Sequence, residues 1–304
     1  MSVLRARAPA KLNLCLLLGP PRPDGLHELV SLVESLSLAD ELELSPLDAA
    51  AERDEVVCPG VEGPNLAAAA LAAFRQATGW DGPPSRLTVA KQIPVAAGLG
   101  GGSTDAAAAL RLAVAAADHV GAGVLEKIAP QLGADVPAQL VPGTHVVAGA
   151  GEEVLPADPL PRHGVLLLPS PERLSTRAVY AEADRLELPR SARDLAAHRA
   201  ALEIALRRGG FVDAHLLVND LEPAARSLCP SIGGALSDAR AAGADRALVC
   251  GSGPTVAGLF PGPAGPEQAA AAAADMGGRH PGAVAAEPVD AEFARPLPAE
   301  TDAA

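Results

Sequence analysis

The sequence predicts an α+β protein, because segments with the alternation of a β-strand occur beside segments with the periodicity of a helix. Apolar residues alternate with other residues at Leu12, Leu14 and Leu16, which is typical of a strand with one buried face. Alanine-rich runs such as 67–73 are typical of helices. A glycine-rich stretch at 98–102 lies between a strand pattern and a helix pattern. Together these patterns predict an α+β fold.

A proline-rich segment divides the chain. Three of the seven residues 156–162 are prolines, and a change of composition of this kind is typical of a connection between domains. The chain of 304 residues is long enough for two hydrophobic cores. We expect an N-terminal domain over residues 1–160, a C-terminal domain over 161–295 and a flexible tail over 296–304.

The first domain is expected to contain both kinds of element. Asn65 precedes an apolar helical pattern and is expected to cap it, because its side chain can accept hydrogen bonds from the first helical N–H groups. The strands expected here are 8–16, 40–44, 56–57 and 86–93, with a strand, a turn and a returning strand over 144–155; the helices are 66–78, 105–118 and 125–132.

The second domain is expected to begin with a buried strand, because residues 164–169 form an apolar run closed by proline. Ser175 or Thr176 is expected to cap the helix that follows. Further helices are expected at 192–207, 219–225, 231–242 and after Pro266, with two strands around a glycine-rich turn over 247–260 and one more strand at 283–286.

Charge and composition argue against several classes of function. A formal net charge of −13, with scattered basic residues, argues against a nucleic-acid partner, since phosphate backbones require clustered lysine and arginine. No uncharged run is both long and apolar enough to cross a bilayer, so no membrane partner is expected. The four cysteines form no Cys-x-x-Cys pair, which suggests neither zinc nor disulfides and fits a cytoplasmic protein. We expect a monomer or a homodimer.

The stretch 94–109 is typical of a phosphate site. Four of the five residues 98–102 are glycines, and they lead into an alanine-rich helix. Glycines let the backbone approach a ligand, and the first N–H groups and the dipole of a helix face an anion. Ser103 stands where a dinucleotide fingerprint needs its third glycine, and the lysine of a Walker A loop is absent. A tight turn before a buried helix is the structural alternative.

Four side chains outside this loop are candidates for binding or chemistry. Lys11 and Asn13 share the face of the first strand opposite its leucines, although an ordinary solvated face would have the same spacing. Asp135 lies in a bend between a glycine and a proline, where a carboxylate can also cap the next turn. His27 follows a turn and could bond a ligand, but a lone histidine is more often a surface or capping residue.

Three motifs together resemble those of the GHMP small-molecule kinases. They are Pro-Ala-Lys-Leu-Asn at 9–13, Pro-x-x-x-Gly-Leu-Gly-Gly-Gly-Ser-Thr-Asp at 94–105 and Gly-Ser-Gly-Pro-Thr at 251–255. Asp-Gly-Leu-His at 24–27 and Gly-Ala-Asp-Val-Pro at 133–137 narrow the resemblance to the branch that phosphorylates 4-diphosphocytidyl-2-C-methyl-D-erythritol in the non-mevalonate isoprenoid pathway. The resemblance implies a two-domain GHMP kinase fold, with a ribosomal-protein-S5-domain-2-like N-terminal domain and a ferredoxin-like C-terminal domain.

The resemblance also implies roles for individual residues. Asp135 would accept the proton of the attacking substrate hydroxyl, and Lys11 would stabilise charge on the reacting oxygens. ATP would be the phosphoryl donor, and Ser103 or Thr104 would help to hold Mg²⁺. The residues implied to wrap the ATP phosphates are Val95, Ala96, Ala97, Gly98, Leu99, Gly100, Gly101, Gly102, Ser103, Thr104 and Asp105.

The substrate side departs from the family at two positions. The residues implied to bind substrate are Asn13, His27, Thr176 and Tyr180. The family usually has a tyrosine that stacks on cytosine where Leu26 stands, and a phenylalanine where Ala138 stands. Losing one stacking ring would cost about 1–3 kcal/mol by analogy with nucleic-acid bases, so we expect weaker substrate binding with catalysis retained. The alternatives are a GHMP kinase for another alcohol, such as homoserine or mevalonate, and a non-catalytic binding protein on this fold.

Overall fold

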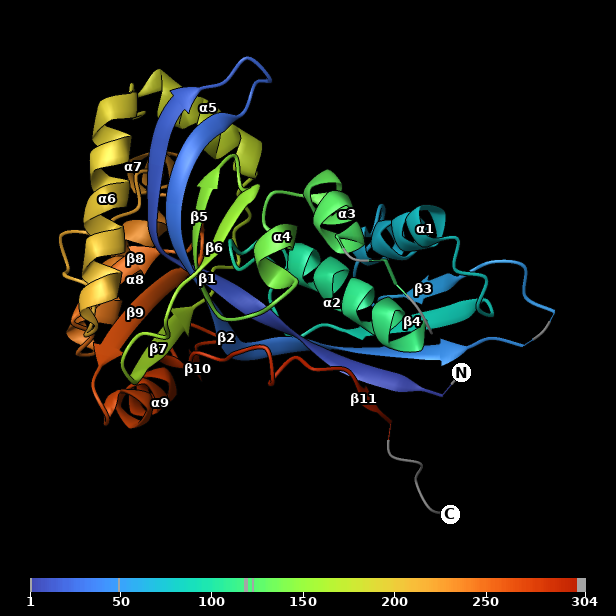
Figure 1. Cartoon of the computed structure of the whole chain (residues 1–304). Helices are drawn as coiled ribbons and strands as arrows, with labels where there is room; N and C mark the ends of the chain where they lie inside the picture. The colour runs from blue at the N-terminus through green and yellow to red at the C-terminus, as the bar shows by residue number, and fades with distance from the viewer. Residues whose placement is uncertain (1, 49, 118–119, 122, 300–304) are drawn as a thin grey trace.

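Two long antiparallel strands organise the fold. The computed structural model describes residues 2–48, 50–117, 120–121 and 123–299. Strands β1 (Leu4–Pro21) and β2 (His27–Pro46) run through both halves of the molecule (Figure 1). Their pairing shifts register on either side of the segment 10–13. Such irregularities re-aim side chains locally, and this segment carries Lys11 and Asn13.

The first sheet has seven strands. Its order is β11-β1-β2-β4-β3, with β5 on β2 and β6 on β5. Strand β2 is shared, because its first part pairs with β5 and its last part with β4, both antiparallel. The remaining strands are β3 (Glu55–Val57), β4 (Ser85–Ala90), β5 (Thr144–Gly149), β6 (Glu153–Pro156) and β11 (Leu297–Pro298).

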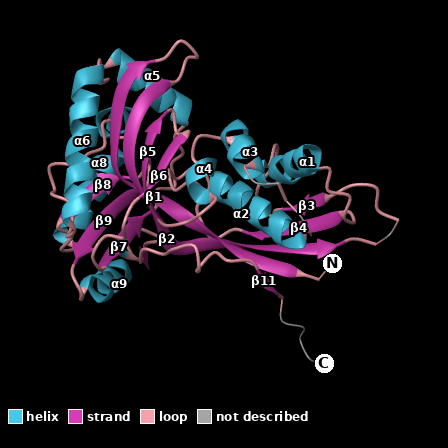
Figure 2. Cartoon of the chain, viewed as in Figure 1, coloured by secondary structure: helices cyan, strands magenta, loops and turns pink. Residues whose placement is uncertain are grey.

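Four helices lie on one face of this sheet (Figure 2). They are α1 (Leu66–Thr78), α2 (Gly101–Ala116), α3 (Val124–Leu132) and α4 (Val136–Gln139). Asn65 caps α1 as predicted, since its Oδ1 accepts a hydrogen bond from the Ala67 N–H at 2.8 Å. The alanines at 106–109 of α2 are fully buried in one core with Phe74 and Val89. Their small side chains allow the start of α2 to approach its neighbours closely.

The second sheet has four strands in the order β10-β7-β9-β8. They are β7 (His163–Leu168), β8 (Arg246–Val249), β9 (Val256–Pro261) and β10 (Val284–Ala286). The helices of this half are α5 (Thr176–Arg185), α6 (Ala192–Arg208), α7 (Glu222–Leu228), α8 (Ser231–Ala241) and α9 (Gly265–Met276). One hydrophobic core contains Leu14 and Leu32 of the first sheet together with Leu167 and Leu259 of the second. This shared core fixes the two sheets against each other.

The α+β architecture is confirmed, and several elements differ locally from expectation; α4 was not predicted, and β1 is longer than the predicted strand 8–16. Helix α2 begins at Gly101 instead of residue 105, so the last glycines of the loop are themselves helical. Helix α7 begins at residue 222 instead of 219, because Asn219 forms a turn in which its Oδ1 accepts from the Leu221 N–H. Part of the segment expected as a flexible tail is a strand, since residues 297–298 form β11 against β1, and residues 300–304 lie outside the described residues.

The division of the chain near residue 160 stays a prediction. Except for β11, the strands of the first sheet precede this point and those of the second follow it. In the part of the chain that the structure describes, no helix combines the length and the apolar character needed to cross a membrane.

Candidate active site

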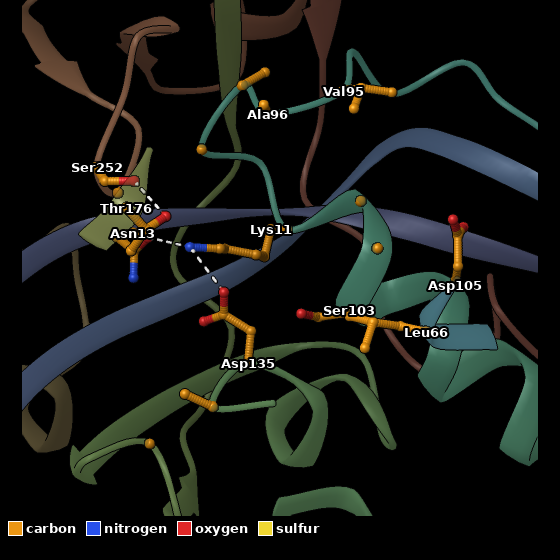
Figure 3. Close-up of a pocket in the computed structure, with 18 of the residues that line it drawn as sticks. Lys11, Asn13, Leu66, Val95, Ala96, Ser103, Asp105, Asp135, Thr176 and Ser252 are labelled. Atoms are coloured by element: carbon orange, nitrogen blue, oxygen red, sulfur yellow. Dashed lines mark hydrogen bonds and ion pairs between the residues drawn. The ribbon is translucent and has the colours of Figure 1, made fainter. Parts of the chain in front are cut away.

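Lys11 and Asp135 meet although they come from distant parts of the chain. The Lys11 Nζ lies 3.4 Å from the Asp135 Oδ2, and Figure 3 shows the two side chains pointing toward one another. Lys11 is only 5% exposed, whereas the Asp135 side chain is 42% exposed. Asp135 directly precedes α4 and makes no capping bond to it. Its carboxylate is therefore available to a molecule in the adjoining cavity.

Asn13 holds the lysine from the other side. The Lys11 Nζ donates a hydrogen bond to the Asn13 Oδ1 at 2.6 Å, and the Asn13 Nδ2 faces the Ser31 Oγ at 2.8 Å. The Ser31 hydroxyl donates to the Cys15 carbonyl. Asn13 is 4% exposed, so the strand face that carries Lys11 and Asn13 is buried instead of solvated. This chain of bonds fixes the ammonium at the edge of the cavity.

The glycine loop opens helix α2 beside Lys11. Gly100 is the N-cap residue with a positive φ of 71°, and the Lys11 N–H donates to the Leu99 carbonyl at 3.0 Å. A Cβ on Gly100 would lie 2.7 Å from the Lys11 Cγ. The first N–H groups of a helix have no partner within that helix, and the first residues of α2, 101–103, line the same cavity as Lys11. This is a suitable place for phosphate.

The glycine-rich turn at 251–255 closes the same site from the second sheet. A Cβ on Gly98, where φ is +80°, would lie 2.0 Å from the Cys250 carbonyl oxygen. A Cβ on Gly251 would lie 3.2 Å from the Lys11 Nζ. The Ser252 hydroxyl bonds the Thr176 hydroxyl at 3.1 Å. The two glycine motifs thus pack directly on each other and on the lysine.

A cavity of about 470 Å³ lies among these groups. The predicted residues that line it are Lys11, Asn13, Val95, Ala96, Ala97, Gly98, Gly100, Gly101, Gly102, Ser103, Asp105, Asp135, Thr176 and Tyr180. Three predicted residues do not line it. Leu99 and Thr104 are buried in the protein, and the Thr104 hydroxyl has no hydrogen-bond partner among the residues that the structure describes. Of the two predicted metal ligands, only Ser103 therefore reaches the cavity.

His27 is the third predicted residue that does not line the cavity. Its Nε2 bonds the Asp184 Oδ1 at 2.8 Å, and its ring lies 5.5 Å from the ring of Tyr180. Burial, with a smaller contribution from the charge of Asp135, raises the pKa of Tyr180 to about 12. Tyr180 therefore keeps its proton at neutral pH, and His27 packs behind it.

The two positions that depart from the family lie outside the cavity as well. Leu26 is 53% exposed, and Ala138 is buried against Val33 and Val147. Leu26 therefore does not replace a stacking ring in this structure, and Tyr180 is the one aromatic residue among the described residues that line the cavity.

Lys91 is a cavity residue that sequence reasoning missed. Its Nζ bonds the Asp105 Oδ2 at 2.7 Å and also bonds Asp40. Burial, only partly offset by Lys91, raises the pKa of Asp105 to about 7. Burial lowers the pKa of Lys91, but its two carboxylate partners outweigh this and raise it. Asp105 is thus tied to Lys91, although it was predicted to bind the cofactor directly.

The far side of the cavity has an apolar wall, which was also missed. It is supplied by the segment before α1 and the start of that helix, and Figure 3 shows Leu66 across the cavity from Asn13. Its apolar residues are Cys58, Val61, Pro64 and Leu66, and Asn65, the N-cap of α1, lies among them. A flat apolar group could lie against it. No local pattern marks residues 58–64, which form neither a helix nor a strand.

Comparison with protein families decides the class of this site. Residues 65–143 match the N-terminal domain of the GHMP kinases, and residues 195–278 match their C-terminal domain. The chain belongs to the GHMP kinases. The expected family and its two-domain fold are therefore confirmed. Members use ATP as phosphoryl donor, so this GHMP kinase is an ATP-dependent phosphotransferase.

Individual relatives are similar over most of this chain. A protein of Kineococcus radiotolerans named 4-diphosphocytidyl-2-C-methyl-D-erythritol kinase is 39% identical over 87% of this chain and 83% of its own. A Streptomyces coelicolor protein of the same name is 39% identical over 83% and 86%. A crystal structure of 4-(cytidine 5'-diphospho)-2C-methyl-D-erythritol kinase is 32% identical, covers 94% of this chain and 99% of its own, and has a TM-score of 0.74.

A more distant structure shares the fold alone. The homoserine kinase from Cytophaga hutchinsonii is 16% identical, with a TM-score of 0.69 over 98% of this GHMP kinase and 97% of its own chain.

Proposed function

We propose that this GHMP kinase transfers the γ-phosphoryl group of ATP to the 2-hydroxyl of 4-diphosphocytidyl-2-C-methyl-D-erythritol, a step of the non-mevalonate isoprenoid pathway. The observation that carries the reaction type is the Lys11–Asp135 ion pair at the open start of α2. The names of relatives about 40% identical support the choice of alcohol. We place the reaction in the cytoplasm, which agrees with the four free cysteines.

The transfer needs one proton acceptor and one cation. The substrate hydroxyl oxygen attacks the γ-phosphorus, its proton passes to the Asp135 carboxylate, and ADP leaves with the electrons of the broken P–O bond. The Lys11 ammonium stabilises negative charge on the carboxylate and on the reacting oxygens. Because Lys11 is buried and fixed by Asn13, little reorganisation is needed during the step.

The nucleotide is held mainly by main-chain atoms. The N–H groups at the start of α2 and in the loop 95–102 suit the phosphates, and the apolar wall around Leu66 suits the nucleoside. Mg²⁺ on a nucleotide needs few protein ligands, and the Ser103 hydroxyl, which lines the cavity, fits this role. When bound, the ion would neutralise phosphate charge. The described residues include no group of three or more His, Cys, Asp or Glu side chains that could hold a metal.

The substrate is expected between the two halves of the molecule. Asn13, Thr176 and Tyr180 line the cavity and supply an amide, a hydroxyl and a ring. His27 packs against the Tyr180 ring. We propose that it contacts only a part of the substrate that extends beyond this ring. With Leu26 outside the cavity, cytosine has one stacking ring, so binding is expected to be weaker than with two.

An ADP-release assay on three alcohols tests this function. The diphosphocytidyl alcohol, homoserine and mevalonate are compared at equal concentrations with ATP, and product masses are recorded. Turnover with the cytidine compound alone supports the proposal. Turnover with homoserine or mevalonate alone would assign another alcohol, and binding of ATP without turnover of any would favour a non-catalytic protein.

A further inference from the structure

The elements that carry the proposed machinery meet at one arginine. Arg111 lies on α2, ten residues after Gly101. Its Nη1 donates to the carbonyl of Gln139, the last residue of α4, at 2.5 Å. Its Nη2 donates to the carbonyl of Arg7 on β1 at 2.9 Å. The guanidinium thus binds main-chain atoms of two elements while its own backbone belongs to a third.

Both bonds lie near the catalytic pair in the chain. Arg7 precedes Lys11 by four residues, and α4 joins Asp135 to Gln139. A helix of one turn is too short to be stable by itself, so the position of α4 depends on what it contacts. Among the described residues, the Asp135 side chain has one ion pair, with Lys11, and no hydrogen bond. The position of the Asp135 carboxylate therefore depends on the position of α4, which directly follows it.

Packing alone does not explain why a charged side chain occupies position 111. Among the described residues no carboxylate pairs with it, and its Nε is buried without a hydrogen-bond partner. Burial lowers the pKa of Arg111 to about 10. A partly buried cation without a counter-ion is less favourable than an apolar side chain at the same place. The forked guanidinium can bind two separate acceptors in a fixed geometry, which an ammonium reproduces poorly. The two carbonyl bonds therefore account for an arginine here.

We propose that Arg111 is a positioning residue that sets the distance between the Asp135 carboxylate and the Lys11 ammonium by holding the end of α4 to β1. Its kinetic consequence rests on the proposed function. At 1.5 Å per residue, Arg111 lies about 15 Å along α2 from the glycine loop. Loss of the guanidinium should therefore move Asp135 while leaving the nucleotide loop in place.

The kinetic test compares Arg111→Lys with Arg75→Lys. Arg75 on α1 also donates to main-chain carbonyls, those of Trp80, Gly82 and Pro83, but far from the catalytic pair along the chain. Arg111→Lys is expected to lower kcat about ten- to a hundredfold, as a small misplacement of a reacting group can, with the KM for ATP within about threefold. Arg75→Lys should keep kcat within about twofold. An equal effect of both substitutions on kcat would overturn the proposal.

Chemical rescue distinguishes the loss of the two guanidinium bonds from a general loss of folded structure. Millimolar guanidinium ion added to Arg111→Ala should raise kcat severalfold, because it can occupy the space left by the side chain and bind the same two carbonyls. Urea at the same concentration should not raise the kcat of Arg111→Ala, and guanidinium should not raise the kcat of the wild type. Far-UV circular dichroism verifies folding, and if Arg111→Ala does not fold, the Arg111→Lys comparison decides. Absence of rescue in folded Arg111→Ala would refute the role of the two bonds.

Hydrogen exchange tests the tether without reference to the substrate. The amides of residue 136 and residues 138–140 should exchange faster in Arg111→Lys than in wild type, while those of α1 should not change; position 137 is a proline without an amide hydrogen. Unchanged exchange at 136–140 would refute the tether. A wild type inactive on the cytidine compound would instead refute the proposed function, and the kinetic comparison would then use whichever alcohol the wild type phosphorylates.

Discussion

Replacing Asp135 by asparagine separates a catalytic role from a structural one. Asparagine keeps the shape of the side chain but carries no charge and does not accept a proton at neutral pH. Two charges 3.4 Å apart interact by about 5 kcal/mol at an effective dielectric constant of about 20. Because the Asp135 side chain is 42% exposed, solvent screening reduces its net contribution to about 1 kcal/mol or less. Asp135→Asn should therefore lower the free energy of unfolding by no more than about 1 kcal/mol.

The expected loss of activity is much larger than this structural effect. A general base contributes about 10²–10⁴-fold, so kcat should fall by two to four orders of magnitude, about 3–5 kcal/mol in the barrier. The KM for ATP should change by less than about threefold, because main-chain groups at the start of α2 bind the phosphates. ADP release with the diphosphocytidyl alcohol measures kcat, and urea denaturation measures stability. A kcat within threefold of wild type would remove Asp135 from the mechanism.

Three further substitutions test the glycine loop, the buried Lys91 ion pairs and a buried histidine of the second sheet. Gly98→Ala should raise the KM for ATP and destabilise the protein by about 1–3 kcal/mol, because its Cβ would lie 2.0 Å from the Cys250 carbonyl oxygen at a positive φ; an unchanged KM in ATP titrations would contradict this. Lys91→Met should cost about 3–5 kcal/mol in urea denaturation, because two buried carboxylates lose their cation; a cost below about 1 kcal/mol would count against the pairing. Burial lowers the pKa of His163, but Glu34 and a backbone carbonyl outweigh it and raise that pKa above 6.5. The stability advantage of wild type over His163→Gln should therefore be complete below pH 6.5 and disappear as pH rises through the higher folded-state pKa; thermal unfolding across this range measures it, and an advantage that grows with pH would refute the assignment.

Features that depend on neighbours in the chain could be predicted from the sequence. The cap formed by Asn65 involves a residue two positions away. The shared strand face of Lys11 and Asn13 follows from the two-residue repeat of a strand, and the glycine loop follows from composition. The burial of Lys11 and Asn13 could not be predicted in this way, because it depends on the packing of the second sheet against β1.

Features that depend on distant residues or on helix phase were missed. Lys91 pairs with Asp40, which is 51 residues earlier, and neither position has a distinctive local pattern. Ser103 and Thr104 were equal candidates for the metal, yet adjacent residues of a helix point about 100° apart. Because α2 begins at Gly101, Ser103 reaches the cavity and Thr104 enters the core. An error of four residues in the start of a helix was enough to hide this difference.

Two glycines of this site leave space for the Lys11 side chain, in addition to the role of the glycine loop in phosphate binding. Gly100 and Gly251 come from two motifs about 150 residues apart in the printed sequence, and a Cβ on either would lie within 3.2 Å of the Lys11 side chain. The buried ammonium can reach Asp135 only because both motifs leave this space free. A larger residue at either glycine should therefore displace the lysine even where phosphate still binds. The three motifs that identify the family therefore meet at one side chain: the first supplies Lys11, and the other two leave space for it beside the cavity.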